Sequence, residues 1–540
     1  MHQACDECLR DVVSQDSSQM YGISYLYGIP SRILTRVDPA QAPRARQRFP
    51  PPVMAKLNYT DYASRPHGPF SNAGPLRLPL QRPPVEERTY HSPAVEEAIT
   101  DMTSQMCDKD LARLFENCYP NTLDTTVRWV SNSTDAAHII AGDMDAAWLR
   151  DNLWQLQAYT SLLSSSDPTI KHLWRGVLYQ QARWVAQSPY SNSFNPPAAS
   201  GITEIAEHVV DMSQDVVTPP TDPKVTFEGK YGLDSLASFL RLSRLYVEKT
   251  ADATLLEDEW LRGLKSVLKV LHEQSKPTFE ESGRFAKPTY SFQRPSNLSM
   301  DCVTGGIGNP VNRGTGLIKS IFRASDDATI LPFHIPSNAF VAVELRRIAT
   351  LLTSVDNVLA SECDQLGIAV EDGIYKHGVH QHPVYGAVFA YEVDGYGSHI
   401  FMDDASPPSL LSLPYLGFVP ADNPVYVNTR RMVLSRKGNP YYVVGSELEG
   451  QGSPHINLET MWPIGTIVQA LTTDVDDEIR WCLETLKKSS AGLGLIHEGV
   501  AVNDSTNYLR SWYAWGNSAF GELILDLADR KPEILFQVMP

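Results

Sequence analysis

Apolar residues recur at helical spacing along most of the chain beyond about residue 92. Roughly a dozen such stretches are separated by loops rich in Gly, Pro, Asn and Asp. Strand patterns are few and short, and the best covers residues 441–444. The pattern predicts an all-α protein with short β-ribbons in its loops. The spacing is clearest for Leu233, Leu236, Leu240 and Val247, then for Ile464, Ile467, Val468 and Leu471, and finally for Ile479, Cys482, Leu483 and Leu486.

One helix start can be placed from local chemistry. Ser92 precedes Pro93, and Glu96 follows within the first turn. A serine hydroxyl accepts a hydrogen bond from a free N–H at a helix start, and proline is tolerated in the first turn. We therefore expect a helix that begins directly after Ser92.

A dozen amphipathic helices must each bury one face. An α-solenoid, a bundle and a double ring of paired helices would all do so. A solenoid would show a sequence repeat of roughly 34 to 47 residues, and we find none. Long polar loops between the helices favour a toroid of paired helices with a site built at one end.

Residues 1–88 differ from the rest of the chain. They contain proline clusters, such as those at 50–52 and 83–84, and show no apolar periodicity. We expect a Pro-rich N-terminal extension over 1–88, partly disordered or wrapped on the surface, and a single helical domain over 89–540.

Composition limits the kinds of molecule that the protein is expected to bind. The chain has 540 residues, is 42% hydrophobic and carries a formal net charge of -17. Such a chain can bury a large core, and its acidity argues against binding nucleic acid. No run of 18 apolar residues occurs, so we expect no membrane span, and we expect a monomer.

The compartment stays open at this stage. The first 30 residues lack a basic region followed by an apolar one, yet N-x-S/T sequons begin at Asn58, Asn132, Asn297 and Asn503. The protein would belong to the secretory pathway if the first residues are an inaccurate start of the gene, and to the cytoplasm otherwise.

Seven cysteines leave at least one thiol unpaired. Cys5 and Cys8 form a lone C-x-x-C without a second pair, which argues against zinc. Cys107 and Cys118 could pair across a short loop. Cys482 falls on an apolar helical stripe and is expected to be an inert core residue.

Acidic residues gather with Arg, Asn, His and Trp in a few loop-like segments. The segments are 142–151, 323–327, 401–405, 428–430, 452–455, 497–498 and 510–515. Taken singly, each is ordinary, since an Asp-Asp pair before a helix is usually an N-cap. Taken together, they supply what a sugar pocket requires: carboxylates and amides for hydroxyls, and Trp faces for the C–H side of the ring.

Glycoside hydrolysis needs two carboxyl groups that flank the scissile bond, one protonated and one ionised. Asp326 and Asp327 are adjacent, and two close carboxylates resist joint ionisation, which raises a pKa. Glu498, next to His497 and near Arg510, suits the ionised role. P-loop, H-E-x-x-H and G-x-S-x-G motifs are absent from the sequence. Asp pairs at 143–145 and 403–404 lie outside any EF-hand loop, and we expect neither metal nor cofactor.

At these segments the sequence resembles glycoside hydrolase family 125, the exo-acting α-1,6-mannosidases, over roughly residues 90 to 535. The blocks are W-L-R-D at 148–151, K-Y-x-x-D-S-L at 230–236, R-x-S-D-D at 323–327, I-P-S-N at 335–338, M-D-D-A at 402–405, N-T-R at 428–430, G-x-G-S-P-H at 450–455, W-P-I at 462–464, H-E at 497–498 and R-S-W-x-A-W at 510–515.

The resemblance implies an (α/α)6 barrel, an inverting exo-mannosidase acting on terminal α-1,6-linked mannose of a glycan, and no metal. It implies a general acid within the pair Asp326 and Asp327, and Glu498 as general base. The blocks imply a mannose pocket formed by Trp148, Arg150, Asp151, Lys230, Asp234, Arg323, Asn338, Asp403, Asp404, Asn428, Arg430, His455, Arg510 and Trp515.

This chain departs from the family pattern at a few positions. Ala324 stands where the family usually has Pro, and Gly499-Val500 follows the proposed base where Ser-Phe is common. Two alternatives therefore stay open: a mannoside-binding protein with impaired catalysis, or a phosphorylase or lyase on the same barrel. For an inverting hydrolase, the two carboxyl groups should stand roughly 6.5–9.5 Å apart.

Overall fold

The computed structural model describes residues 57–71, 73–203, 212 and 214–536. The chain divides into two compact units, Met1–Ala55 and Lys56–Pro540. The first unit, with the C-x-x-C of Cys5 and Cys8, lies outside the described residues, so only residues 57–88 of the predicted extension can be followed. The boundary at 88 stays a prediction.

Helices dominate the described part of the second unit, as the apolar spacing predicts. The Ser92 hydroxyl accepts the N–H of Val95 and caps the helix that begins at Pro93, so this helix start is confirmed. The helices are α1 Tyr59–Ala63, α2 Pro93–Gln105, α3 Lys109–Cys118, α4 Asn121–Thr125, α5 Leu149–Gln157, α6 Pro168–Gln187, α7 Leu233–Thr250, α8 Asp258–Gln274, α9 Ile335–Leu352, α10 Asn357–His377, α11 Leu413–Leu416, α12 Pro424–Val433, α13 Pro463–Leu471, α14 Asp476–Lys488, α15 Ala514–Arg530 and α16 Pro532–Phe536.

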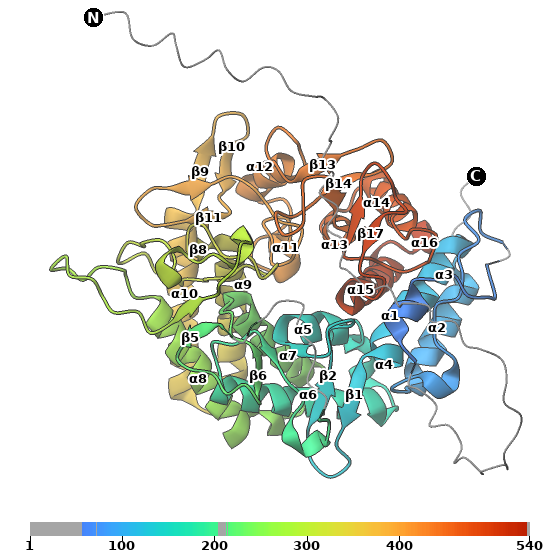
Figure 1. Cartoon of the computed structure of the whole chain (residues 1–540), viewed down its shortest axis with the longest axis horizontal. Coiled ribbons are helices and arrows are strands. Elements are labelled where there is room, and N and C mark those ends of the chain that lie inside the picture. The colour runs from blue at the N-terminus through green and yellow to red at the C-terminus, as the bar shows by residue number, and fades with distance from the viewer. Residues whose placement is uncertain (1–56, 72, 204–211, 213, 537–540) are drawn as a thin grey trace, which may run out of the picture. The chain divides into compact units, whose positions relative to one another are not determined.

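Two layers of helices lie around a common centre in this unit. Figure 1 shows α5, α7, α9, α11, α13 and α15 nearest the centre, with α6, α8, α10, α12 and α14 outside them. Successive inner helices touch, α11 against α9, α9 against α7, α7 against α5, α5 against α15 and α15 against α13. The core between the layers is built on large side chains such as Trp174, Trp260 and Trp462, all fully buried. Paired packing of this kind buries one face of every amphipathic helix.

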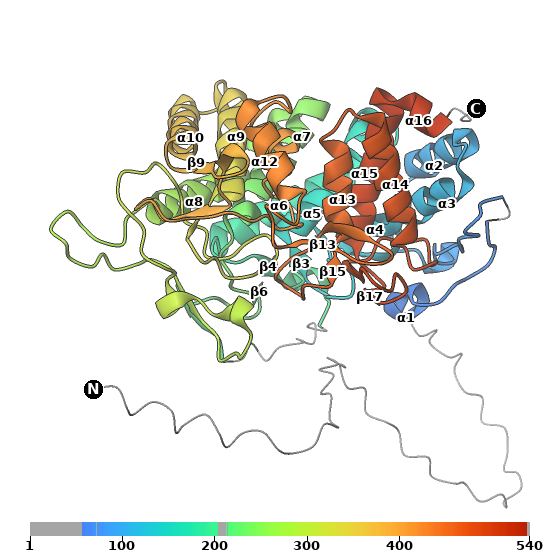
Figure 2. The same ribbon diagram turned by 90° about the horizontal axis from the view of Figure 1, so that it is seen from above.

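The strands are short and lie in the connections between helices. Figure 2 shows β3, β4, β6, β13, β15 and β17 gathered on one side of the helices. The strand predicted at 441–444 is β13. The strands are β1 Val127–Val130, β2 Ala137–Ile139, β3 Ala147–Trp148, β4 Ser193–Phe194, β5 Val216–Thr218, β6 Thr226–Glu228, β7 Ser291–Gln293, β8 Phe333–His334, β9 Val379–His382, β10 Gly386–Phe389, β11 Glu392–Val393, β12 His399–Ile400, β13 Tyr442–Val444, β14 Glu449–Gln451, β15 Thr460–Met461, β16 Gly499–Ala501 and β17 Tyr508–Leu509.

Three of the small sheets have three strands each, in the orders β3-β4-β6, β12-β11-β8 and β15-β16-β17. β3 leads directly into α5, and β8 leads directly into α9. β15 ends two residues before α13 begins. The sheets therefore fix where three inner helices begin, and the N-termini of these helices lie beside the loops on the strand side.

The described part of the N-terminal extension packs on the helical domain. Tyr59 in α1 is buried and donates its hydroxyl proton to the carbonyl of Gln81 over 2.8 Å. Arg82 pairs with Asp124 at 2.7 Å and with Glu96 at 2.6 Å. These contacts tie the extension to α2 and α4.

The possible disulfide between Cys107 and Cys118 is wrong, since both are free thiols. Cys118 is buried on α3, whereas Cys107 is exposed after α2 ends. Cys482 is buried in the core on α14, as predicted. Among the described residues, no helix has the length and apolarity required to cross a membrane.

Candidate active site

The predicted acids do not cap a helix but lie in a turn. Asp326 donates its N–H to the carbonyl of Arg323, and Arg323 donates its own N–H to the carbonyl of Asp327. Asp326 has a φ of 64°, in the left-handed region that disfavours residues with a Cβ. This turn directs the two neighbouring carboxyl groups toward different partners.

Asp326 faces a cluster of cations and donors. Arg150, in the first turn of α5, reaches both of its carboxylate oxygens at 3.3 and 3.4 Å. Asn192 donates to the same carboxylate at 3.1 Å, and Lys230 donates to the Asp326 backbone carbonyl at 3.1 Å. Burial alone would raise the pKa of Asp326, but Arg150, Lys230 and Asn192 outweigh it and lower the pKa. Asp326 is therefore an ionised carboxylate at neutral pH.

Two further acids surround Arg150. Asp151 accepts from its Nε at 3.2 Å, and Asp234, in the first turn of α7, lies 3.8 Å from its Nη1. Burial raises the pKa of each acid to about 6, even though Arg150 acts in the opposite direction. The guanidinium also lies over the ring of Trp515 at 4.8 Å. One arginine thus links three carboxyl groups and an indole.

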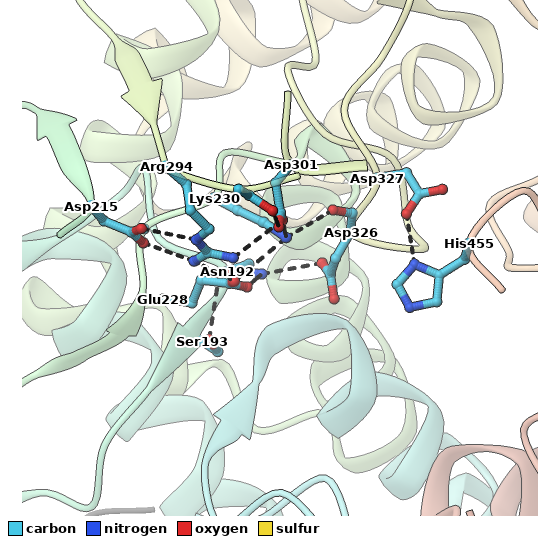
Figure 3. Close-up of polar contacts among 12 residues, drawn as sticks. Asn192, Ser193, Asp215, Glu228, Lys230, Arg294, Asp301, Asp326, Asp327 and His455 are labelled. Carbon is cyan, nitrogen blue, oxygen red and sulfur yellow. Dashed lines mark hydrogen bonds and ion pairs between the residues drawn. The ribbon is translucent and has the colours of Figure 1, made fainter. Parts of the chain in front are cut away.

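Asp327 faces the other way, toward His455. His455 Nδ1 lies 2.6 Å from Asp327 Oδ1 (Figure 3). Burial would lower the pKa of His455, but the hydrogen bond to Asp327 and the charges of Asp327, Glu498 and Asp326 raise it to about 9. Asp404 lies behind this pair and accepts from the hydroxyls of Ser325 and Ser453. The pKa of Asp404 is raised, first by burial and then by the charge of Asp327. His455 therefore keeps its proton across neutral pH, at hydrogen-bond distance from Asp327.

Glu498 stands in a third environment, directly before β16. Arg510, which follows β17, donates to Glu498 at 2.9 Å and to both carboxylate oxygens of Asp143 at 2.6 and 2.7 Å. The charge of Glu498 acts on His455 and also on Asp151, so the acids of the three environments share one electrostatic neighbourhood. The side chains of Asp326, His455 and Glu498 keep 23%, 25% and 15% of their surface exposed, whereas that of Asp327 keeps 5%.

Other predicted pocket residues use their polar groups within the protein. The side-chain amide of Asn338 is fully buried and bonds the backbone of Ile318 and His334. Arg323 pairs with buried Glu392 at 2.6 Å, which anchors the turn of Asp326 to β11. Asp403 accepts the N–H groups of Leu410 and Leu411, together with the side-chain amide of Gln451.

Three more predicted pocket residues make their contacts with other parts of the protein. Arg430 on α12 bonds Thr472 and Glu478 at the ends of α13 and α14. Asn428, on the same helix, donates to the carbonyl of Ala387 in β10. Trp148 packs edge-on against Phe227 in a small buried cluster.

Sequence reasoning missed a set of buried charges behind Asp326. Figure 3 shows Asn192, Glu228, Arg294 and Asp301 on the side of Asp326 away from His455. Arg294 bonds Asp215, Glu228 and Asp301 at 2.7, 3.0 and 3.2 Å. These residues lie scattered over about 110 positions. No motif marks them, because each is an ordinary polar residue in its own segment.

Gly499, the departure next to Glu498, has a steric reason. A Cβ at this position would lie 2.6 Å from Cγ2 of Thr460 on the paired strand β15. A side chain at this position would require Thr460 to move, directly beside Glu498. Within the described ranges, no three His, Cys, Asp or Glu side chains are grouped as a metal site would need.

Comparison with known proteins identifies the family of the chain. The model of the GH125 family, described as metal-independent α-mannosidases, matches residues 108–525. The meiotically up-regulated gene 157 protein of Schizosaccharomyces pombe is 48% identical over 490 residues, covering 90% of this chain and 95% of that protein.

A solved structure is also similar. It is a metal-independent α-mannosidase from Streptococcus pneumoniae in a non-productive complex with α-1,6-mannobiose. It is 29% identical, with a TM-score of 0.74, and the match covers 82% of this chain and 99% of that one. Because the family model matches most of the chain and a close relative matches nearly all of it, this protein belongs to the GH125 family of metal-independent α-mannosidases.

Proposed function

We propose that this protein is an exo-acting, inverting glycoside hydrolase that releases terminal α-1,6-linked mannose, built on a closed (α/α)6 barrel. The α-mannosidase class comes from the family, and the α-1,6 linkage is favoured by the disaccharide bound to the similar Streptococcus pneumoniae enzyme. The carrying observation is that two carboxyl groups have different partners: Asp327 hydrogen-bonds to His455, whose pKa is raised to about 9, while Glu498 pairs with Arg510.

In this mechanism the pair of Asp327 and His455 protonates the glycosidic oxygen as the bond from that oxygen to C1 breaks. Glu498 takes a proton from a water that attacks C1 from the opposite face, so the anomeric centre inverts. Asp326 is a poor proton donor because Arg150 and Lys230 hold it ionised. We assign the binding of mannose hydroxyls to Asp326, Arg150 and Asp151. Trp515 supports Arg150, because the guanidinium lies over its ring.

The other predicted pocket residues take supporting roles in this proposal. Asn338, Arg323, Asp403, Asn428 and Arg430 hold loops and helices, because each bonds to groups of the protein. Trp148 packs the start of α5. Asp404 accepts from the hydroxyls of Ser325 and Ser453 and so holds the loops beside Asp327.

The reaction is tested with α-1,6-mannobiose and NMR of the product. We expect β-mannose as the first product, and a loss of turnover by several orders of magnitude in Glu498→Gln with mannose binding retained. Initial release of α-mannose would refute inversion. Phosphate dependence or an unsaturated product would point instead to a phosphorylase or lyase, and binding without turnover in the native protein would indicate an impaired enzyme.

The choice of acid is tested with a substrate that needs no protonation. An aryl α-mannoside with a strongly acidic phenol as leaving group should be cleaved by Asp327→Asn at close to the native rate, while mannobiose should not. Asp326→Asn should lose activity on both substrates, because sugar binding is needed in each case. The opposite result would transfer the role of acid to Asp326 and leave the proposed reaction intact.

A further inference from the structure

We infer that Arg294, which cannot touch a substrate, positions the turn that carries Asp326 and Asp327. This inference rests on the proposed function. The guanidinium of Arg294 is almost wholly buried, with 2% of its side chain exposed. It lies behind Asp326 as seen from His455 (Figure 3). Any effect on catalysis must therefore pass through the groups that it holds.

Arg294 is itself held by a two-stranded ribbon. β5 pairs with β7, with Val216 opposite Gln293. Asp215 and Arg294 are the next residues on the two strands, and they form two parallel hydrogen bonds of 2.7 and 2.8 Å. A bidentate pair of this kind fixes the plane of the guanidinium as well as its position. The ribbon thus points Arg294 in one direction.

From Arg294 two connections reach Asp326. The first runs through Glu228, which accepts from Arg294 at 3.0 Å and from Asn192 at 3.0 Å, and Asn192 then donates to the Asp326 carboxylate at 3.1 Å. The second runs through Asp301, which contacts Arg294 at 3.2 Å and Lys230 at 3.0 Å. Lys230 in turn donates to the Asp326 carbonyl. One connection holds the carboxylate and the other holds the backbone.

The backbone of Asp326 needs such support. Its φ of 64° is disfavoured for a residue with a Cβ and persists only when surrounding contacts impose it. That conformation sends Asp326 toward Arg150 and Asp327 toward His455. Without Arg294, the buried carboxylates of Asp215, Glu228 and Asp301 would repel one another and draw Lys230 away from Asp326.

The test compares Arg294→Ala and Arg294→Lys with Arg284→Ala. Arg284 lies ten residues earlier in the same long connection, pairs with Glu280, and has 78% of its side chain exposed. We expect Arg294→Ala to lower kcat on α-1,6-mannobiose about 100-fold, with KM changed far less, because the reacting groups are misplaced while sugar contacts remain. Arg294→Lys should recover part of kcat, and Arg284→Ala should match the native enzyme.

A second readout does not depend on activity. The pKa of His455, followed by NMR of labelled histidines, depends on Asp327, Glu498 and Asp326, which are the charged groups that face it. Misplacing the turn should lower this pKa by about one unit or more in Arg294→Ala. It should not change in Arg284→Ala. If Arg294→Ala does not fold, kcat and the His455 pKa are measured in Arg294→Lys and Asp215→Asn instead.

Unchanged kcat together with an unchanged His455 pKa in folded Arg294 variants would overturn the inference. A lowered His455 pKa in a protein whose native form releases no mannose would support the positioning role and refute the proposed reaction instead.

Discussion

Two histidines near the candidate site show how single neighbours decide protonation. Burial lowers the pKa of His497 to about 4, although the carbonyls of Arg510 and Ser490 at its ring nitrogens act in the opposite direction. His455 is partly buried, yet Asp327 raises its pKa to about 9. A carboxylate partner at hydrogen-bond distance therefore outweighs desolvation.

This difference predicts a pH dependence for His455. Its folded pKa lies above the ordinary value of 6.5, so protonation stabilises the fold fully below pH 6.5, and the contribution is lost as pH rises through about 9. Relative to His455→Gln, the native protein should lose on the order of 2 kcal/mol of its stability advantage over that range. Urea unfolding at pH 6 and pH 10 measures the change, and an equal difference at both values would contradict it.

The same proton should appear in the kinetics. If Asp327 and His455 donate it, kcat/KM on mannobiose falls above about pH 9 in the native enzyme. In Asp327→Asn the burial of His455 is no longer opposed by its main partner, so its own pKa should move below 6.5. Histidine NMR in this variant checks the shift, and a pKa that stays near 9 would contradict it.

At the scale of elements, α1 contacts residues 511 and 512, which directly follow Arg510, the partner of Glu498. Tyr59 packs edge-on against Trp512 with ring centroids 5.3 Å apart, and Ser511 donates to the carbonyl of Thr60 over 2.8 Å. Arg510, which pairs with Glu498, directly precedes Ser511 and has a φ of 53°. Residues outside the stretch matched by the family model thus support a candidate catalytic group.

Removing this contact should therefore affect both stability and turnover. Tyr59→Ala takes a buried aromatic ring from the interface and should cost about 3 kcal/mol, together with part of kcat. Tyr62→Ala is the matched control, because Tyr62 lies in the same helix but is half-exposed and stacks on His67. The thermal melting temperature and kcat are measured for both variants. Equal losses of stability and kcat in the two variants would show that α1 acts only as a surface cover.

At the scale of the whole helical unit, ion pairs join neighbouring inner helices. Arg244 on α7 reaches Glu344 on α9 at 2.7 Å, and the exposed fractions of the two side chains are 5% and 0%. Breaking such a buried pair leaves an uncompensated charge, so Glu344→Gln should cost about 3 kcal/mol. Glu371→Gln breaks the exposed pair of Arg346 with Glu371 and should cost less than about 1 kcal/mol. The denaturant midpoints of the two variants measure these losses of stability, and similar midpoints would contradict the expectation.

The sequence by itself determined the helices, the residue types of the site and the family. Apolar spacing predicted α7, α13 and α14, and Ser92 marked the start of α2, because these signals depend on neighbours within a few positions. The blocks around Arg150, Asp326 and Glu498 were likewise visible as local clusters of acids with cations.

Only the tertiary structure decided what each polar group meets. Arg150 and Asp326 are 176 positions apart, and no periodicity shows that they touch. Arg430 and Asn338 share motifs with the site, yet they turn toward other helices and loops, while Arg294 belongs to no motif and supports the turn of Asp326. Protonation follows the same rule, because a pKa is set by burial and by charges brought close in space, and the order of residues along the chain specifies neither.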